Sequence, residues 1–177
     1  MELVSYQGYR CDVFVAVADA GGVLAGVWTG LTVFGEETHT VEELADPAAF
    51  ATFTKRLHDL ALPETPRPEG KVPETTLWWV DGYEYLGRLS IRHELSDWLR
   101  EFGGHIGYVV RPSSRRHDYA GAMLAASLPI ACDLGIDPAL LTCDAVNAGS
   151  RQVIESNGGV FEDQRKDMLR FWVPTSC

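Results

Sequence analysis

The fold is decided by one stretch of the sequence, Gly104-His105-Ile106-Gly107-Tyr108-Val109-Val110-Arg111-Pro112-Ser113-Ser114-Arg115-Arg116-His117-Asp118-Tyr119-Ala120. It predicts a strand, then a loop, then the start of a helix at Tyr119. Amide groups at a helix start point outward, and the helix dipole favours negative charge there. With Arg115 and Arg116 beside it, the loop is suited to a pyrophosphate. The alternative is a solvated basic turn.

Regular elements are expected on both sides of this stretch. Strands are expected at 75–80, 83–91, 105–111, 140–143, 160–162 and 169–173, the first two joined as a hairpin by Asp81-Gly82. Helices are expected at 96–102, 119–134 and 147–156, the last one closed by Asn157-Gly158-Gly159. Pro129 is expected to kink or split the second helix. This order of expected strands and helices predicts a mixed α/β domain.

The first 72 residues are less regular. Thr40, followed by Glu42 and Glu43, is a helix-start pattern, and apolar residues at helical spacing continue it to Leu62. Four prolines between 63 and 73 predict a stiff loop. The apolar run 13–34 is either two strands or a first helix. Its central Asp19 and the lack of a preceding basic cluster argue against a membrane span or signal peptide.

Composition places the chain among single globular domains and argues against a nucleic-acid-binding surface, which would need a basic face. It has 177 residues, 46% hydrophobic and 23% charged, with 15 Lys+Arg against 25 Asp+Glu, a net charge of −10. Residues 111–120 hold three arginines and one aspartate, which is +2, so the other residues carry −12. The loop is therefore a basic island on an acidic chain.

The cysteines do not predict a metal site or a disulfide framework. Cys11, Cys132, Cys143 and Cys177 form no C-x-x-C pair and no zinc-type spacing with histidine. We expect reduced thiols in a cytoplasmic protein.

The chain resembles the GNAT superfamily of acyl-CoA-dependent N-acyltransferases over about residues 73–173. It looks closest to a bacterial branch of predicted acetyltransferases with these segments in order: Arg92-His93-Glu94-Leu95, Gly103-Gly104-His105-Ile106-Gly107-Tyr108, Leu141-Thr142-Cys143-Asp144, Asn147, Ser150 and Val153-Ile154-Glu155-Ser156-Asn157-Gly158-Gly159. The resemblance implies one GNAT-like domain over 1–177, with 73–177 as its core and 1–72 as a variable part with helices. It implies a central twisted sheet, splayed between the 105–111 and 140–143 strands.

The resemblance also implies where acetyl-CoA, the co-substrate, would lie. Its pantetheine arm would lie in the splay and pair with Tyr108, Val109 and Val110. The pyrophosphate would sit on the loop formed by Arg115, Arg116, His117, Asp118, Tyr119 and Ala120. Asn147 and Ser150 match positions that contact the arm, although both also suit capping of their own helix. The amine of a small molecule would attack the thioester directly, and a backbone N–H of the first strand would stabilise the oxyanion.

Two residues depart from the family pattern. Asp118 replaces the central glycine of the phosphate loop, and a carboxylate about 4 Å from a phosphate charge would cost roughly 4 kcal/mol. Either Asp118 points away, pairing with Arg115 or Arg116, or CoA binding is weakened. Ile154 stands where many GNAT enzymes place a tyrosine that protonates the thiolate. Tyr108 and Tyr119 are other tyrosines, but the sequence places neither of them at the sulfur. Water or the product amine is the alternative source of the proton.

The candidate bases are His93, Glu94 and His105. His93 and Glu94 lie where a strand gives way to a short helix, at the expected mouth of the acceptor cleft, or are a surface pair. His105 shares a strand face with Gly107 and Val109, and is either in the site or a satisfied core histidine. Trp78, Trp79, Trp98 and Trp172 are expected mainly in the core, with Trp98 as a candidate for the acceptor pocket.

Three functional hypotheses follow. The leading one is an N-acetyltransferase that transfers an acetyl group from acetyl-CoA to the amine of an unidentified small molecule. The acidic surface favours a cationic acceptor, such as a polyamine or an amino sugar, by electrostatic steering. The second is a degenerate GNAT domain that has lost acyl-CoA and acts as a binding module or catalyses other chemistry. The third is an interaction protein without a site. A homodimer is a further expectation, because GNAT domains often dimerise.

Overall fold

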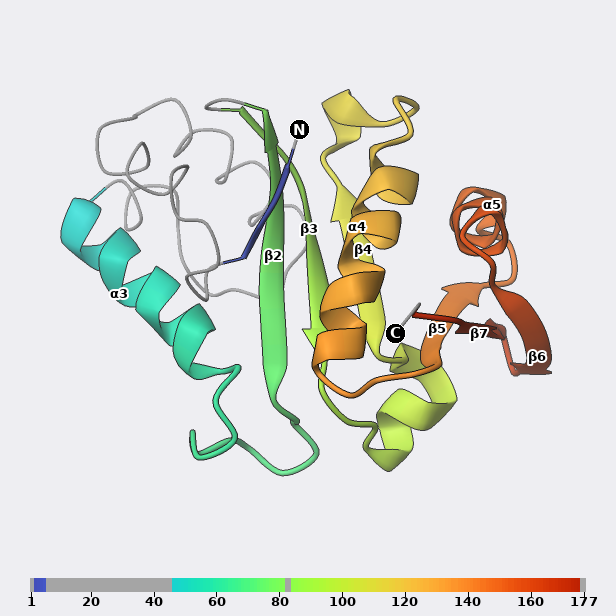
Figure 1. Cartoon of the computed structure of the whole chain (residues 1–177), viewed down its shortest axis with the longest axis horizontal. Coiled ribbons are helices and arrows are strands. Elements are labelled where there is room, and N and C mark those ends of the chain that lie inside the picture. The colour runs from blue at the N-terminus through green and yellow to red at the C-terminus, as the bar shows by residue number, and fades with distance from the viewer. Residues whose placement is uncertain (1, 6–45, 82–83, 176–177) are drawn as a thin grey trace.

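The structure is a computed structural model that describes residues 2–5, 46–81 and 84–175 (Figure 1). The expected helix or strand pair at 13–34 and the helix start at Thr40 lie outside these residues. The described strands are β1 (Glu2–Ser5), β2 (Glu74–Asp81), β3 (Glu84–Arg92), β4 (Ile106–Val110), β5 (Ala139–Asp144), β6 (Val160–Arg165) and β7 (Met168–Val173). The helical elements are α3 (Pro47–Asp59), the π-helical turn η1 (Leu99–Gly103), the 3-10 turn η2 (Pro112–Ser114), α4 (Tyr119–Asp133) and α5 (Ala148–Ser156).

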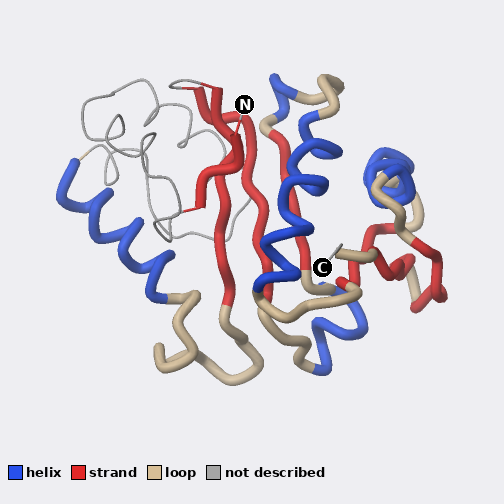
Figure 2. Tube along the Cα trace, viewed as in Figure 1, coloured by secondary structure: helices blue, strands red, loops and turns tan. Residues whose placement is uncertain are grey.

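The strands form two separate antiparallel sheets. The first has the order β1-β2-β3-β4 and the second has the order β5-β7-β6. Thus β4 and β5, which follow each other along the chain on either side of α4, are both edge strands among the described elements. The expectation of a mixed α/β fold with a splay between these two strands is confirmed (Figure 2).

Helices lie on both faces of the first sheet. On one face, α4 packs on β3 and β4, and its Met123 and Leu124 share the main core cluster with Leu89 of β3 and with Ile106 and Val110 of β4. On the other face, α3 packs against β2. The ring of Phe50 in α3 lies 6.2 Å from that of Trp78, centroid to centroid. The apolar spacing that predicted this helix therefore corresponds to its buried face.

The α3 helix begins at Pro47. Asp46 caps it by accepting from the N–H groups of Ala48 and Ala49, and Pro47 occupies the first helical position. Phe50, Phe53 and Leu57 are buried as expected, but the helix ends at Asp59, before Leu62.

Neither a split of α4 at Pro129 nor a reduced thiol at Cys132 is found. The α4 helix is continuous through Pro129, because the buried apolar residues on both sides of the proline hold it against the sheet. Cys132, near its C-terminal end, is disulfide-bonded, whereas Cys143 is a free, buried thiol. Sequence spacing shows no Cα separation, which is what decides whether two cysteines pair.

Two tryptophans meet the expectation of core positions. Trp78 and Trp79 of β2 are 6% and 5% exposed, whereas Trp98 is 63% exposed beside Phe102. None of the helices in the described ranges is long and apolar enough to span a membrane.

Candidate functional site

Strands β4 and β5 touch at one end and separate at the other. The N–H of His105 donates to the carbonyl of Leu140 over 2.7 Å, and the N–H of Leu140 donates to Nδ1 of His105 over 2.8 Å. Gly104 packs so closely that a Cβ on it would lie 2.5 Å from the Leu140 oxygen. We call this contact the closed end. Beyond it the two strands belong to different sheets, and this separation is the splay.

The backbone of β4 presents alternate residues to the splay. At one end of the β3–β4 ladder Arg92 donates its N–H to the carbonyl of His105, and at the other Arg111 donates to Leu86. The register between them has no shift. Hydrogen-bonded positions alternate along an antiparallel ladder, so the N–H and C=O groups of Ile106, Tyr108 and Val110 point away from β3. These groups face the splay, where an extended ligand would find them.

One side chain crosses from β4 to α5. The Tyr108 hydroxyl lies 2.9 Å from Oγ of Ser150 and 3.3 Å from the Ser150 carbonyl oxygen. Burial raises the pKa of Tyr108 to about 12, so the phenol stays protonated. Asn147 caps α5 by accepting from the Ser150 N–H with its Oδ1. The structure therefore brings Tyr108, Asn147 and Ser150 together, and shows the capping role for Asn147.

The loop between β4 and α4 contains two left-handed residues. Arg116 has φ 65° and Asp118 has φ 60° and ψ 15°. Aspartate enters this region more readily than most side chains, so Asp118 adopts a conformation that glycine would otherwise supply. Arg115 donates through Nε to the Val110 carbonyl, and the rings of His117 and Tyr119 stack at 5.7 Å.

The Asp118 carboxylate lies beside the first turn of α4. A Cβ built on Gly121 would lie 2.7 Å from Oδ1 of Asp118, so the carboxylate occupies space that only a glycine leaves open. It makes no capping hydrogen bond to the amides of α4. In the described part of the chain it forms no ion pair with Arg115 or Arg116, so the expected pairing is not found. The sequence interpretation missed Gly121, whose signal was a glycine three residues after Asp118.

His105 has the structural role that was one of its two alternatives. Its Nδ1 accepts the Leu140 N–H, and its ring lies 6.5 Å from that of Trp172. Burial, reinforced by Arg100 and Arg92, lowers its pKa to about 4. A neutral imidazole with an occupied nitrogen is a weak base near pH 7, so this histidine holds the closed end together.

His93 and Glu94 lie at the end of β3. The Nε2 atom of His93 lies 2.8 Å from Oγ1 of Thr75 on β2, while Glu94 is exposed. Burial lowers the pKa of His93, and the positive charge of Arg67 adds to this. His93 is therefore neutral near pH 7 and able to accept a proton.

Arg92, next to this pair, was missed by the sequence interpretation. Its Nη1 donates to the carbonyls of Gly103 and Gly104, and its Nε lies 3.3 Å from Oε2 of Glu74. The guanidinium also covers Gly107, where a Cβ would lie 3.4 Å from Nη1. The Arg92-His93-Glu94-Leu95 segment therefore contains a residue that fixes the turn leading into β4.

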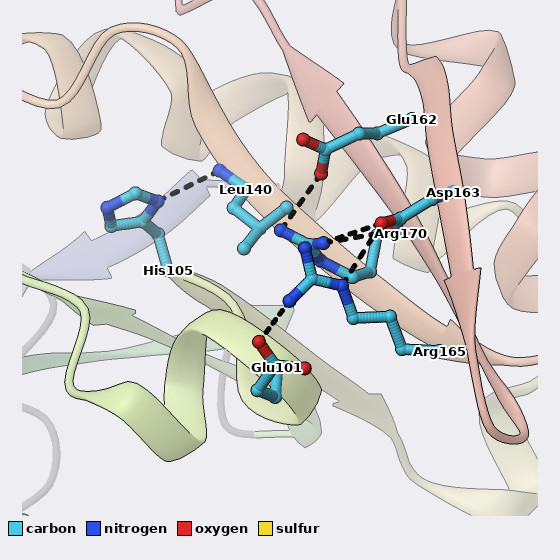
Figure 3. A network of polar contacts seen from close by, with 7 residues as sticks. All are labelled: Glu101, His105, Leu140, Glu162, Asp163, Arg165 and Arg170. Atoms are coloured by element: carbon cyan, nitrogen blue, oxygen red, sulfur yellow. Dashed lines mark hydrogen bonds and ion pairs between the residues drawn. The ribbon is translucent and has the colours of Figure 1, made fainter.

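An ionic network ties η1 to the second sheet (Figure 3). Arg165 of β6 contacts Glu101 of η1 and lies 3.0 Å from Asp163. Arg170 of β7, 2% exposed, lies 2.9 Å from both Glu162 and Asp163. Thr142 of β5 donates to the Phe102 carbonyl. The contacts of Glu101 and Phe102 therefore join η1, which precedes β4, to β6 and β5 of the second sheet.

The arrangement fits an extended anionic ligand better than a metal ion. The described residues contain no cluster of three or more His, Cys, Asp or Glu side chains that suits a metal. The loop after β4 offers uncapped amides, two left-handed residues and two arginines, which together favour a pyrophosphate. The edge of β4 that pairs with none of the described strands continues from that loop toward the closed end. Acyl-CoA has this combination of groups.

Comparison with known families agrees with this geometry. The family model described as an acetyltransferase (GNAT) domain matches residues 37–160, more than half of the chain. No curated protein sequence matches the chain.

Solved structures with the same fold cover nearly the whole chain at low identity. The N-acetyltransferase PseH of Campylobacter jejuni in complex with acetyl coenzyme A has a TM-score of 0.54 at 10% identity, over 99% of both chains. Spermidine N-acetyltransferase of Vibrio cholerae in complex with CoA and spermine has a TM-score of 0.54 at 15% identity, over 99% of this chain and 96% of that one. The putative acetyltransferase yncA of Salmonella typhimurium with acetyl-CoA has a TM-score of 0.53 at 14% identity, over 99% and 95%.

Proposed function

The chain belongs to the GNAT acetyltransferase family, and from this premise we propose that it transfers the acetyl group of acetyl-CoA to the amine of a cationic small molecule. The observation that carries the proposal is the free edge of β4, which runs from the arginine-bearing loop to the closed end. Acetyl-CoA supplies an activated acetyl group as its thioester. The protein binds the donor along β4 and orients the carbonyl for attack by the amine.

The N–H groups of β4 that face the splay are the proposed oxyanion donors. Ile106, Tyr108 and Val110 present such groups. A donor of this kind stabilises the negative charge that develops on the carbonyl oxygen when the amine attacks. The loop residues Arg115, Arg116, His117, Tyr119 and Ala120, with Asp118, are proposed to hold the pyrophosphate, and Val109 and Ser150 to line the arm.

His93 and Glu94 are proposed to accept the proton that the attacking amine loses. His93 is neutral near pH 7, and Glu94 is exposed beside it. Loss of the acidic limb of the kcat/KM profile in His93→Gln, with Glu94→Gln unchanged, would assign the base to His93. An unchanged profile in both variants would contradict this assignment.

A cationic acceptor is favoured by charge. The chain carries a net charge of −10, whereas residues 111–120 at the phosphate loop carry +2. Clefts on acidic proteins attract cations by electrostatic steering. The similarity to spermidine N-acetyltransferases supports polyamines as first candidates, with amino sugars next.

The test combines calorimetry with a panel of amines. We expect acetyl-CoA to bind the folded protein and mass spectrometry to detect acetylated polyamines or amino sugars. No binding heat at millimolar acetyl-CoA would overturn the acetyltransferase proposal. Binding without any acetylated cationic amine, but with turnover of neutral amines, would overturn only the acceptor class.

The Asp118→Asn variant distinguishes an acetyltransferase from the second hypothesis, a degenerate GNAT domain that has lost acyl-CoA. Asparagine tolerates the left-handed conformation and removes the charge. Because the carboxylate is exposed and makes no bond to the α4 amides, we expect the affinity for CoA to rise less than tenfold. A rise of several hundredfold would mean that the native loop has lost its ligand. Neither the structure nor the comparisons support that alternative.

A further inference from the structure

We propose that Trp98 and Phe102 form a binding surface for an ammonium group of the acceptor, beside the closed end of the splay. The inference rests on the proposed acetylation of a cationic amine and deepens it, because it names the residues that would select such a substrate.

The two aromatic side chains lie together at η1. Trp98 immediately precedes this turn and is 63% exposed, and its ring lies 6.2 Å from that of Phe102, centroid to centroid. The carbonyl of Phe102 accepts from the Thr142 hydroxyl of β5, which ties the pair to the second sheet. The negatively polarised face of an aromatic ring attracts a cation, and tryptophan does so most strongly.

An ammonium group already lies against this surface. Nζ of Lys166, in the turn between β6 and β7, is 5.1 Å from the centroid of the Phe102 ring, which is within the range of a cation–π contact. Lys166 has a left-handed backbone with φ 53°, and its carbonyl accepts from the Gln164 side chain. A primary ammonium therefore fits Phe102, while Trp98 beside it stays exposed to solvent.

The segment that carries the two rings is acidic. Residues 94–101 contain three acidic residues and one arginine, a formal charge of −2. Glu101 is paired with Arg165 (Figure 3). Glu94 and Asp97 are exposed, and neither forms an ion pair with a described residue. Their negative charge favours an ammonium group on this segment over a neutral or an anionic group.

The surface lies beside the closed end. Gly103 leaves room for the indole, since a Cβ built on it would lie 2.8 Å from Cζ3 of Trp98. The next residue, Gly104, packs against the Leu140 carbonyl at the closed end. The proposed path of the donor along β4 ends there. A second ammonium on an amine that attacks the thioester is therefore expected to lie near Trp98.

Opposite kinetic effects are expected from the two sides of the surface. In Trp98→Leu, KM for spermidine should rise about 3- to 10-fold, because leucine is apolar but has no aromatic face. Trp98→Phe should restore most of this loss. In Lys166→Gln, KM for spermidine should fall about two- to fivefold, because the competing ammonium leaves Phe102. The control is Lys55→Gln, which removes the same charge from α3 and should keep this KM unchanged.

Binding without turnover provides the second test. The probe is spermidine trihydrochloride, added to the full chain and followed by NMR at the indole N–H of Trp98. This signal is identified by its absence from the spectrum of Trp98→Phe. We expect it to shift saturably with spermidine, and not with sodium chloride at equal ionic strength.

The outcomes separate this surface from the proposed function. An unchanged spermidine KM in Trp98→Leu, or an unshifted Trp98 signal, would overturn the surface and leave the acetyl transfer intact. An equal rise in KM for an uncharged arylamine would also overturn it, because Trp98 would then act without regard to charge. A saturable shift in a chain that acetylates no amine would support the ammonium site and overturn the proposed acetyl transfer.

Discussion

At the residue scale, the Asp118 carboxylate lies where a side chain at position 121 would otherwise be. Asp118 adopts the left-handed backbone at the start of α4, and Gly121 leaves room for its carboxylate three residues later. The two residues are therefore coupled, because a side chain at position 121 would require the Asp118 carboxylate to move from its position. Measured as a double-mutant cycle, such coupling appears as non-additive changes in the free energy of unfolding.

We predict opposite signs for Gly121→Ala in two backgrounds. In the native chain it should lower the free energy of unfolding by about 1 kcal/mol, because the new methyl group meets Oδ1 of Asp118. In an Asp118→Gly background it should raise that energy by a few tenths to about 1 kcal/mol, because alanine favours helix over glycine. Urea unfolding of the four chains measures this. The same sign in both backgrounds would contradict the coupling.

The protonation of a single residue, His105, makes the free energy of unfolding depend on pH. Its pKa is lowered from 6.5 in the unfolded chain to about 4 in the fold. Between these values the unfolded state binds more protons, so stability is complete above pH 6.5 and is lost as the pH falls through that window. Protonation also turns the Nδ1 acceptor of the Leu140 N–H into a donor.

We predict that His105→Asn removes this loss. Asparagine still offers an oxygen to the Leu140 N–H but does not titrate. From pH 7 to pH 5 the native chain should lose about 1 to 2 kcal/mol more than the variant, after a discount for solvent screening, as measured by urea unfolding at both values. His58→Asn, at the end of α3, is the control and should follow the native chain. A native loss no larger than that of His105→Asn would refute the assignment.

At the element scale, the entry into β4 depends on one backbone geometry. Gly104 has φ 65° and ψ −177°, a region that only glycine occupies freely. It also lies against the Leu140 carbonyl, so conformation and packing both require the absence of a side chain. Arg92 donates to the carbonyl oxygens of Gly103 and Gly104. The turn is therefore fixed by Arg92 on β3 and by Leu140 on β5.

We predict that Gly104→Ala is costly compared with a glycine of similar φ. The variant should lose about 3 kcal/mol or more of unfolding free energy, because strain and a backbone clash add. Gly135→Ala is the matched control: φ is 78°, but nothing lies within 4 Å of a built Cβ, so about 1 kcal/mol is expected. Equal unfolding midpoints for the two variants would contradict the packing argument.

Sequence patterns predicted the positions of helices and strands better than they predicted the contacts between distant residues. Alternating apolar residues located β2 to β5 within one or two residues, and glycines marked the ends of η1 and α5. The continuity of α4 through Pro129 and the disulfide of Cys132 escaped prediction, because both depend on neighbours distant in the sequence. Local propensity cannot show which tertiary contacts override it.

The position of the candidate phosphate loop between a strand and a helix was predictable, whereas the side-chain contacts around it were less so. The loop from Arg115 to Ala120 and the strand at Tyr108 were found from the order of residue types. The sequence left two alternative roles open for each of His105 and Asn147, because their structural roles depend on single hydrogen bonds. His105 Nδ1 accepts from the Leu140 N–H, and Asn147 Oδ1 accepts from the Ser150 N–H. Arg92 and Gly121 were missed because their function lies in packing.

At the scale of the whole molecule, the chain is acidic and its phosphate-loop segment is basic. The net charge is −10, with +2 at residues 111–120. A long-range field of this kind acts on the association of a charged acceptor and is screened over about 10 Å at 0.1 M salt.

We predict that added salt lowers the efficiency of acetylation for a polyamine. Between about 0.05 and 0.3 M sodium chloride, kcat/KM should fall several-fold while kcat stays nearly constant, because screening acts on the encounter. An uncharged arylamine acceptor is the control and should show no such fall. A flat profile for both acceptors would remove the argument for a cationic substrate.

The alternation along β4 has a consequence for amide hydrogen exchange. The N–H groups of Gly107 and Val109 point toward β3, whereas those of Ile106, Tyr108 and Val110 point into the splay. In the free protein the first two should exchange more slowly than the other three. Saturating acetyl-CoA should slow exchange at Tyr108 or Val110 and leave Gly107 and Val109 unchanged, as measured residue by residue by NMR. The donor would then act as an additional strand at an edge that the described part of the chain leaves unpaired.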